Sequence, residues 1–189
     1  MEGAPPAVVI AQKAGGVAAT MMGGGLPFEV ANHDLFSRSV GILSTLPLAA
    51  ISASDTHNDQ EDHGVCGIQL GNTQDVAGRI RGAWCGKKDA SAANEVTIDL
   101  LEAQLVTGVA LRGRGTYTHG QMQWPTLVEI ETSRDGTTWH REGRFVGVFD
   151  QTTVAKRPLQ CPRLASFVKV KIVTYHGHPS MRMDILVAK

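Results

Sequence analysis

Two alternating runs of residues between Glu95 and Gly115 constrain the fold of this chain more than any other feature. In the first run, Val96, Ile98 and Leu100 point to one side and polar residues point to the other. Residues 105–111 repeat the alternation. A period of two is typical of strands with one buried face. The LEAQ link between the runs is short enough to join neighbouring antiparallel strands, and we expect that arrangement here.

Similar strand signals recur from Pro47 to the end of the chain, and no sustained helical period of 3.6 residues appears there. The predicted strands span residues 48–54, 66–70, 95–100, 105–112, 126–132, 137–141, 145–149, 167–175 and 183–187. Asp135 and Gly136 form a turn signal between two of them. Many short strands without intervening helices indicate a β-sandwich or jelly roll.

The first quarter of the chain differs in composition from the rest. Residues 1–27 are rich in Ala, Gly, Pro and Met and predict a flexible tail. Residues 28–46 carry enough apolar side chains to pack against a core, as a short helix beginning near Asn32 or as an irregular arm. We therefore expect one main domain, residues 47–189, preceded by an arm and a tail.

Composition limits the classes of partner. The 18 Lys and Arg balance the 18 Asp and Glu, so no net charge attracts the whole chain to nucleic acid. The three cysteines do not describe a disulfide framework, and reduced thiols are the simpler expectation. The chain shows neither a signal peptide nor an apolar run of about 20 residues. We expect a cytoplasmic or non-classically secreted protein.

Several motifs follow one another in an order that resembles a known family. They are Gly82-Ala83-Trp84-Cys85, Leu111-Arg112-Gly113-Arg114-Gly115, Ser133-Arg134-Asp135-Gly136-Thr137-Thr138-Trp139 and Ser180-Met181-Arg182-Met183-Asp184. Together they resemble the discoidin domain, also called the coagulation factor 5/8 type C domain, and the first two are similar to slime-mould discoidin lectins. The resemblance covers residues 47–187. It implies an all-β, eight-stranded antiparallel jelly roll whose loops at one end bind sugars, phospholipid head groups or proteins.

Two departures from this family pattern bear on function. Extracellular members usually join their ends through a cysteine pair, and no cysteine lies near Leu46 or Val187. This favours reduced surroundings. Membrane-binding members carry large apolar residues at loop tips, whereas the first long loop, Asp55–Gly64, has none. We therefore expect no membrane insertion.

The loop from Asp55 to His63 holds the densest polar chemistry of the chain. It is read as a solvated loop, as part of a ligand site, or as a calcium site, since its carboxylates and amides suit sugar hydroxyls and hard cations. The EF-hand spacing is absent. His176 and His178 form the one tight histidine pair, but a turn around Gly177 explains that segment without zinc.

Arginines and aromatic residues at strand ends complete the candidate site. We expect Arg112 and Arg182 to form ion pairs with Asp99, Glu129 or Asp184 in the barrel wall. Trp84, Trp124 and Trp139 lie in framework motifs, which leaves Tyr117 as the best aromatic for ligand contact. The predicted ligand-binding residues are Asp55, His57, Asn58, Asp59, Arg81, Arg114, Tyr117 and His119.

These observations predict binding without catalysis. No nucleophile elbow, HExxH or phosphate-binding loop is present. The expected ligand is a carbohydrate, galactose or N-acetylgalactosamine, bound without a cofactor and with calcium as the alternative. Homo-oligomers would strengthen weak single sites. The competing hypothesis is an intracellular adaptor that binds a partner protein and no sugar.

Overall fold

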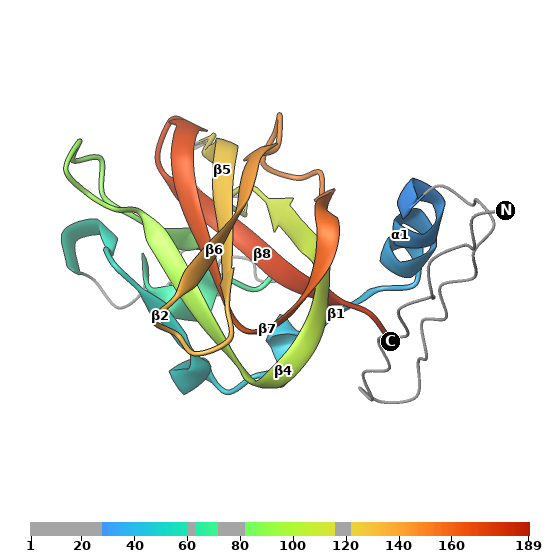
Figure 1. Cartoon of the computed structure of the whole chain (residues 1–189). Coiled ribbons are helices and arrows are strands. Elements are labelled where there is room, and N and C mark those ends of the chain that lie inside the picture. Colours follow the sequence, from blue (N-terminus) through green and yellow to red (C-terminus); the bar gives the residue numbers. More distant parts are fainter. Residues whose placement is uncertain (1–27, 60–62, 72–81, 116–121) are drawn as a thin grey trace, which may run out of the picture.

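The computed structural model describes residues 28–59, 63–71, 82–115 and 122–189, and most of them lie in one antiparallel β-sheet closed into a barrel-like sandwich (Figure 1). The strands are β1 (Val40–Gly41), β2 (Ile51–Ala53), β3 (Trp84–Cys85), β4 (Glu95–Arg112), β5 (Trp124–Ser133), β6 (Trp139–Val146), β7 (Ala155–His176) and β8 (Ser180–Val187). Their order is β1-β8-β4-β7-β5-β6, with β2 on β4 and β3 on β8. This confirms the expected all-β class.

Strand β4 corrects the prediction for residues 95–112. The two alternating runs are one continuous strand that bends, and they do not pair with each other. Glu95–Asp99 pairs with Lys171–Phe167 of β7, and Gln104–Leu111 pairs with Ala165–Ala155 of the same strand. The LEAQ link is a bulge in which Leu101 has a φ of 66° and is 63% exposed. An outward bulge keeps the register of both halves while the strand turns between the two sides of the sandwich.

Other predicted strands also differ from the structure. The predicted strands 137–141 and 145–149 both fall on the single strand β6. Residues 66–70 form no strand; a 3₁₀ turn at Val65–Gly67 is followed by a single bridge between Gln69 and Met183. Strand β7 begins at Ala155, well before the predicted residue 167, because its first half pairs with the second half of β4. The alternation was hidden there by two prolines, Pro158 and Pro162.

The core between the two sides of the sandwich is aliphatic. Trp84 is completely buried, as its framework motif predicted, and it is the largest side chain in the core. Around it pack residues that alternate along β4, β5, β7 and β8. They include Val96, Ile98, Leu111, Val128, Ile130, Val168, Val170, Met183 and Ile185. Burial of such side chains stabilises the fold by about 1.5–3 kcal/mol each relative to exposure.

The segment before the barrel packs against β4 and β8. Helix α1 (Phe28–Ser37) takes the helical form of the two alternatives, and β1 then pairs with β8. The Leu43 amide donates to Asp184 Oδ1 at 2.8 Å, and burial raises the pKa of Asp184. A Cβ at Gly41 would lie 2.2 Å from Asp184 Oδ2, so only glycine fits this contact. The predicted tail, residues 1–27, lies outside the described residues.

Arg182 has a framework role, but its described partners differ from the predicted ion pairs. The side chain is 1% exposed, and it donates to the carbonyl oxygens of Gly113 at 2.7 Å, Gln151 at 3.1 Å and Leu70 at 3.3 Å. Arg112 likewise donates to the carbonyls of Thr152 and Leu70. Burial lowers the pKa of Arg182 to about 10, and backbone dipoles from three separate loops solvate its charge.

None of the helices in the described ranges has the length and apolar composition needed to cross a bilayer. Cys85 is buried, and Cys66 and Cys161 are half-buried. The domain boundaries and the cellular location stay predictions.

Replacement of Arg182 by leucine should lower the free energy of unfolding by about 3–5 kcal/mol, because three backbone carbonyls lose a hydrogen bond from a buried charged group. Arg182→Lys keeps the charge but lacks the planar guanidinium group, so its free energy of unfolding should lie between those of the leucine variant and the wild type. Urea unfolding followed by tryptophan fluorescence measures both. Equal stability of all three proteins would show that Arg182 does not hold these loops.

Candidate functional site

Several loops are tied together at the end of the barrel where β4 begins and β7 ends. The Asn94 amide donates to the Asp55 carboxylate at 2.9 Å, which joins the loop after β2 to the start of β4. The Gly86 amide donates to the carbonyl of Pro179 at 2.8 Å, and the Arg114 amide donates to the carbonyl of Gln123 at 2.9 Å. These bonds bring together most of the described loops that the sequence marked as polar.

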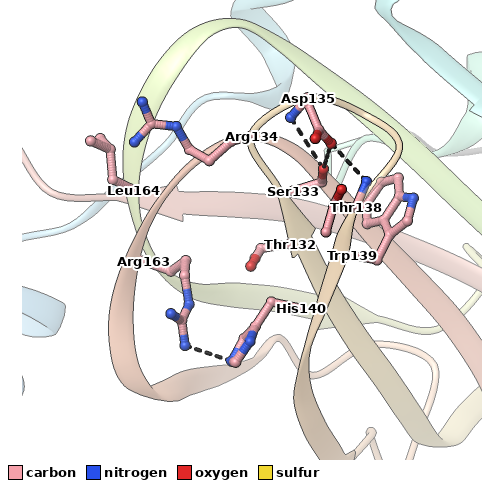
Figure 2. Close-up of a pocket in the computed structure, with 9 residues that line it drawn as sticks. All are labelled: Thr132, Ser133, Arg134, Asp135, Thr138, Trp139, His140, Arg163 and Leu164. Atoms are coloured by element: carbon pink, nitrogen blue, oxygen red, sulfur yellow. Dashed lines mark hydrogen bonds between the residues drawn. The ribbon is translucent and has the colours of Figure 1, made fainter.

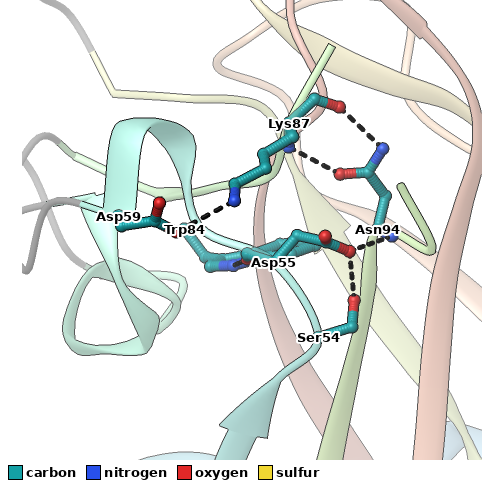
Figure 3. A network of polar contacts seen from close by, with 6 residues as sticks. All are labelled: Ser54, Asp55, Asp59, Trp84, Lys87 and Asn94. Carbon is teal, nitrogen blue, oxygen red and sulfur yellow. Dashed lines mark hydrogen bonds and ion pairs between the residues drawn. The ribbon is translucent and has the colours of Figure 1, made fainter. Parts of the chain in front are cut away.

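Asp55 lies inside this arrangement as a structural residue (Figure 3). Besides the Asn94 amide, its Oδ2 accepts a 2.6 Å hydrogen bond from Ser54 Oγ, and its carbonyl accepts one from Trp84 Nε1 at 2.9 Å. The Ser54 hydroxyl, followed by backbone amides including that of Asn94, lowers the pKa of Asp55 despite partial burial. Asp55 therefore uses its oxygens to connect the first loop to the core.

The loop between β3 and β4 is closed by one amide side chain. Asn94 accepts from the Lys87 amide and donates to the Lys87 carbonyl, each at 2.8 Å (Figure 3). Asn94 has a φ of 50°, a conformation that asparagine tolerates better than most residues. A Cβ at Gly86 would lie 1.9 Å from Asn94 Oδ1, so glycine is required at that position.

Asn58 and Asp59 are exposed residues of the first loop, and we call His57–Asp59 the tip. Both have positive φ, 53° and 54°, which turns the chain sharply and places their side chains in solvent. The Asp59 carboxylate lies 2.9 Å from Lys87 Nζ across the gap between two loops (Figure 3). This ion pair raises the pKa of Lys87. A ligand with hydroxyl groups would find an acceptor and a donor here, side by side and accessible to water.

Three histidines meet beneath that tip. His57 lies with its ring centroid 5.0 Å from that of His63 and 4.7 Å from that of His178. His178 is 7% exposed, and its Nε2 lies 3.3 Å from Nδ1 of His57. Burial, followed by the nearby positive or protonable groups, lowers the pKa of His178 to about 4. His57 is thus a contact between the tip and the barrel.

Arg114, predicted as a ligand residue, is only 4% exposed. Its Nη1 donates to Gln123 Oε1 at 2.8 Å, and the same oxygen accepts from Ser180 Oγ at 2.9 Å. Burial makes Arg114 a supporting residue of the site floor in this structure rather than an exposed donor.

Aromatic and apolar groups lie at the same end of the barrel as Asn58 and Asp59. Trp124 and His176 stack with their centroids 4.1 Å apart, and His176 is exposed. Met122 is 57% exposed and Phe149 is 80% exposed at the same end of the barrel. Trp124 is therefore only partly in the framework, and the His176–Trp124 stack offers a flat surface of the kind that sugar rings use.

Arg81, Tyr117 and His119 lie outside the described residues, so their part in the site stays a prediction. The structure brings Asp55, His57, Asn58, Asp59 and Arg114 to one end of the barrel. It adds groups that sequence reasoning did not assign: Lys87, Trp124, His176 and His178. The His176-Gly177-His178 spacing was visible in the sequence, but its contact with His57 depends on tertiary structure.

A pocket of about 450 Å³ lies elsewhere, beside the β5–β6 turn (Figure 2). Its polar groups bond to one another. Asp135 accepts from the amides of Thr137 and Thr138, and Glu142 accepts from Thr132 and Arg163. A ligand there would have to break these bonds, which makes the pocket a weaker candidate than the loop end.

Within the described part of the chain, no three His, Cys, Asp or Glu side chains are arranged to hold a metal ion. The described geometry thus supplies hydrogen-bond donors and acceptors, an ion pair and an aromatic face.

Substitution of Asp55 by alanine should destabilise the fold by about 1–2 kcal/mol, since a buried amide and a hydroxyl lose their acceptor. Asp59→Ala removes only an exposed ion pair and should change the stability far less. The pKa of Asp55 is lowered by folding, so its stabilisation is present at neutral pH and is lost as the pH falls below about 4.

Urea unfolding at pH 7 and at pH 3 measures this difference. The difference in the free energy of unfolding between wild type and Asp55→Ala should be smaller at pH 3 than at pH 7. A difference that is unchanged at pH 3 would contradict the role given to the Asp55 carboxylate.

The relatives of this chain include a slime-mould discoidin and several mammalian lactadherins. Discoidin-1 of Dictyostelium discoideum is 35% identical over 79 residues, which is 40% of this chain and 30% of that protein. The chain spans 26% to 39% of the length of the curated relatives it matches.

Two solved structures share the fold. Discoidin II of Dictyostelium discoideum has a TM-score of 0.67 at 19% identity and covers 80% of this chain and 59% of its own. The family 32 CBM of Clostridium perfringens NanJ, solved in complex with galactose, has a TM-score of 0.53 at 16% identity, covering 74% of this chain and 96% of its own.

The family model of the F5/8 type C domain matches residues 50–185, which include β2 to β8 apart from the last two residues of β8. With the antiparallel sheet and the ordered motifs of the sequence, this match shows that the chain belongs to the F5/8 type C, or discoidin, domain family.

Proposed function

We propose that this domain binds a terminal sugar of the galactose type without chemically changing it. Domains of this family are binding modules for carbohydrates or lipids. The observation that carries the proposal is the exposed Asp59–Lys87 pair beside Asn58, held at the end of the barrel. Hydroxyl groups of a sugar are both donors and acceptors, and such a pair offers both complements. The galactose complex of the structural neighbour supports the choice of sugar.

Recognition of a hexose would use two hydrogen bonds and one stacking contact. A hexose would accept from Lys87 Nζ and donate to an Asp59 oxygen, and its less polar face would pack on the Trp124–His176 stack. Competition with water keeps single-site affinity low, so binding would gain from several copies on one surface. Oligomer formation is part of this proposal. Calcium is not required by the Asp59–Lys87 pair.

Simultaneous replacement of Asp59 and Lys87 by alanine should weaken binding to an immobilised galactose surface at least about tenfold, which corresponds to ~1.4 kcal/mol. Glu102→Ala is the matched control, because Glu102 is an exposed acid on the β4 bulge. Surface plasmon resonance with galactose and with glucose, each with and without EDTA, measures affinity and selectivity. Unchanged binding by the double variant would overturn the site, and loss with EDTA would establish a calcium role.

A second candidate function has one observation in its favour. Phe149 is 80% exposed and Met122 is 57% exposed at the same end of the barrel as the polar tip. The expectation of no membrane insertion was drawn from the first loop alone, and Phe149 lies on a different loop, between β6 and β7. Exposed aromatic side chains at loop tips suit the interface of a lipid bilayer.

If a lipid surface is the ligand, Phe149→Ser should reduce sedimentation with vesicles of phosphatidylserine and phosphatidylcholine by at least about fivefold, since a buried Phe contributes ~1.5–3 kcal/mol. Leu101→Ser is the control, because Leu101 is also exposed but lies on the β4 bulge and not on the β6–β7 loop. If the wild-type protein binds galactose and does not bind vesicles, the sugar is the ligand. If it binds neither galactose nor vesicles, the adaptor hypothesis is favoured.

A further inference from the structure

A chain of hydrogen bonds runs from His57 in the tip to buried side chains of the barrel. His57 Nδ1 lies 3.3 Å from His178 Nε2, and His178 Nδ1 lies 3.3 Å from Ser180 Oγ. Ser180 Oγ lies 2.9 Å from Gln123 Oε1, which Arg114 Nη1 also contacts at 2.8 Å. His178, Ser180, Gln123 and Arg114 are all buried. These hydrogen bonds join three segments that are far apart in the sequence.

The donors in this chain of hydrogen bonds can point in one consistent direction. Gln123 Oε1 accepts, so the Ser180 hydroxyl donates to it and keeps a lone pair for His178 Nδ1–H. His178 Nε2 then carries a lone pair and accepts from His57 Nδ1–H. His57 Nε2 accepts from Asn58 Nδ2 at 3.2 Å. The network thus assigns His178 the Nδ1–H tautomer and places a proton on Nδ1 of His57.

A second proton on His178 removes the Nε2 lone pair that accepts from His57 Nδ1–H. As long as His57 keeps that tautomer, two N–H groups then face each other across the 3.3 Å contact. The charged and titratable groups that act on His178 are His57, Lys88, Arg114 and His63, which are all cationic or protonable. Repulsion from these groups adds to the cost of charging a buried ring.

Among the described residues, the carboxylates of the neighbouring loops already have other hydrogen-bond or ion-pair partners. Asp55 accepts from Ser54 and from the Asn94 amide, and Asp59 pairs with Lys87. Asp89 accepts from Ser91 within its own loop. Protonation of His178 therefore weakens its contact with His57.

We propose that His178 is a positioning residue that holds the ligand-binding tip His57–Asp59 in place, and that acid releases the tip by breaking the His57–His178 contact. The inference rests on the proposed function, because the tip carries Asn58 and Asp59 of the proposed sugar site. Ligand is held at neutral pH and released in acid, so the domain discriminates between neutral and acidic surroundings.

The sign of the effect follows from the lowered pKa of His178, about 4 in the folded protein against an ordinary value of 6.5. The opened or unfolded chain binds more protons than the closed state between these values. The closed state therefore loses stability as the pH falls through this window, and it keeps its full stability above about pH 7.

The test variant is His178→Gln. Its side-chain oxygen can accept from His57 Nδ1–H whether His57 is neutral or protonated, so the contact survives in acid. Wild-type binding to an immobilised galactose surface should fall at least about tenfold between pH 7 and pH 4.5. In His178→Gln the ratio of affinities at the two pH values should be below about threefold, whatever its affinity at pH 7. His33→Gln, an exposed histidine on α1, should behave as wild type.

Nuclear magnetic resonance without ligand separates this inference from the proposed function. In the wild type, the ring nitrogens of His57 and His178 should report Nδ1–H tautomers at pH 7, and the amides of Asn58 and Asp59 should shift together with the protonation of His178. If galactose fails to bind at every pH, the sugar proposal is wrong and these shifts still decide the switch.

Three results would overturn the switch. The first is a parallel acid loss of binding in wild type and His178→Gln. The second is titration of His178 with no change in the amides of the tip. The third is an Nε2–H tautomer of His178 at pH 7. Poor folding of the glutamine variant would leave the wild-type titration as the deciding measurement.

Discussion

Strand β4 pairs with β7 on both sides of one bulge, and the rest of the barrel depends on that double pairing. The two halves of β4 face different parts of the same long partner, so the bulge at Leu101 converts two flat ladders into two sides of a sandwich. Strands β8 and β2 extend β4, and β5 and β6 extend β7. A register shift of one residue in either half would turn Val96 or Val109 away from the core.

Closure of the sandwich leaves many strand ends at one end, where backbone groups need partners. Arg182 and Arg112 solve this for the loops around Gly113, Leu70 and Thr152 by donating to their carbonyl oxygens. Asp55 solves it for the start of β4 by accepting the Asn94 amide. These charged side chains therefore form hydrogen bonds to the backbone of the loops, whereas the side chains of Asn58 and Asp59 are exposed and can contact a ligand.

The sequence was sufficient for the fold class, for the family and for the polar character of the loop end. Period-two alternation reports which face of a strand is buried, and it reported this correctly for Val96, Ile98 and Leu100. It does not report whether a chain reverses between two runs. The LEAQ link therefore read as a connection between neighbours, although Leu101 adopts a positive φ and continues the strand.

The candidate site was predictable in part for the same reason. Residue type showed that Asp55, His57, Asn58 and Asp59 could meet a polar ligand, and residue type alone could not separate Asp55, which accepts a backbone amide, from Asp59, which faces solvent. Arg114 illustrates the same limit, because its burial follows from contacts with Gln123 that lie nine residues along the chain. Exposure is a tertiary property.

The contact between His57 and His178 can weaken in acid in a pH range where an ion pair at the same place would stay constant. An ion pair at the position of His57 and His178 would hold the tip through a wide pH range, because carboxylates and arginines keep their charge between about pH 5 and 10. Two imidazoles in contact share one proton, and a proton added to His178 Nε2 removes the lone pair that accepts it. The burial of His178, its cationic neighbours and the one-way order of the donors all act in the same direction. Under the proposed switch, the loops held by Arg182 and Asp55 keep their attachment down to about pH 5, whereas the attachment of the tip is already weakened there.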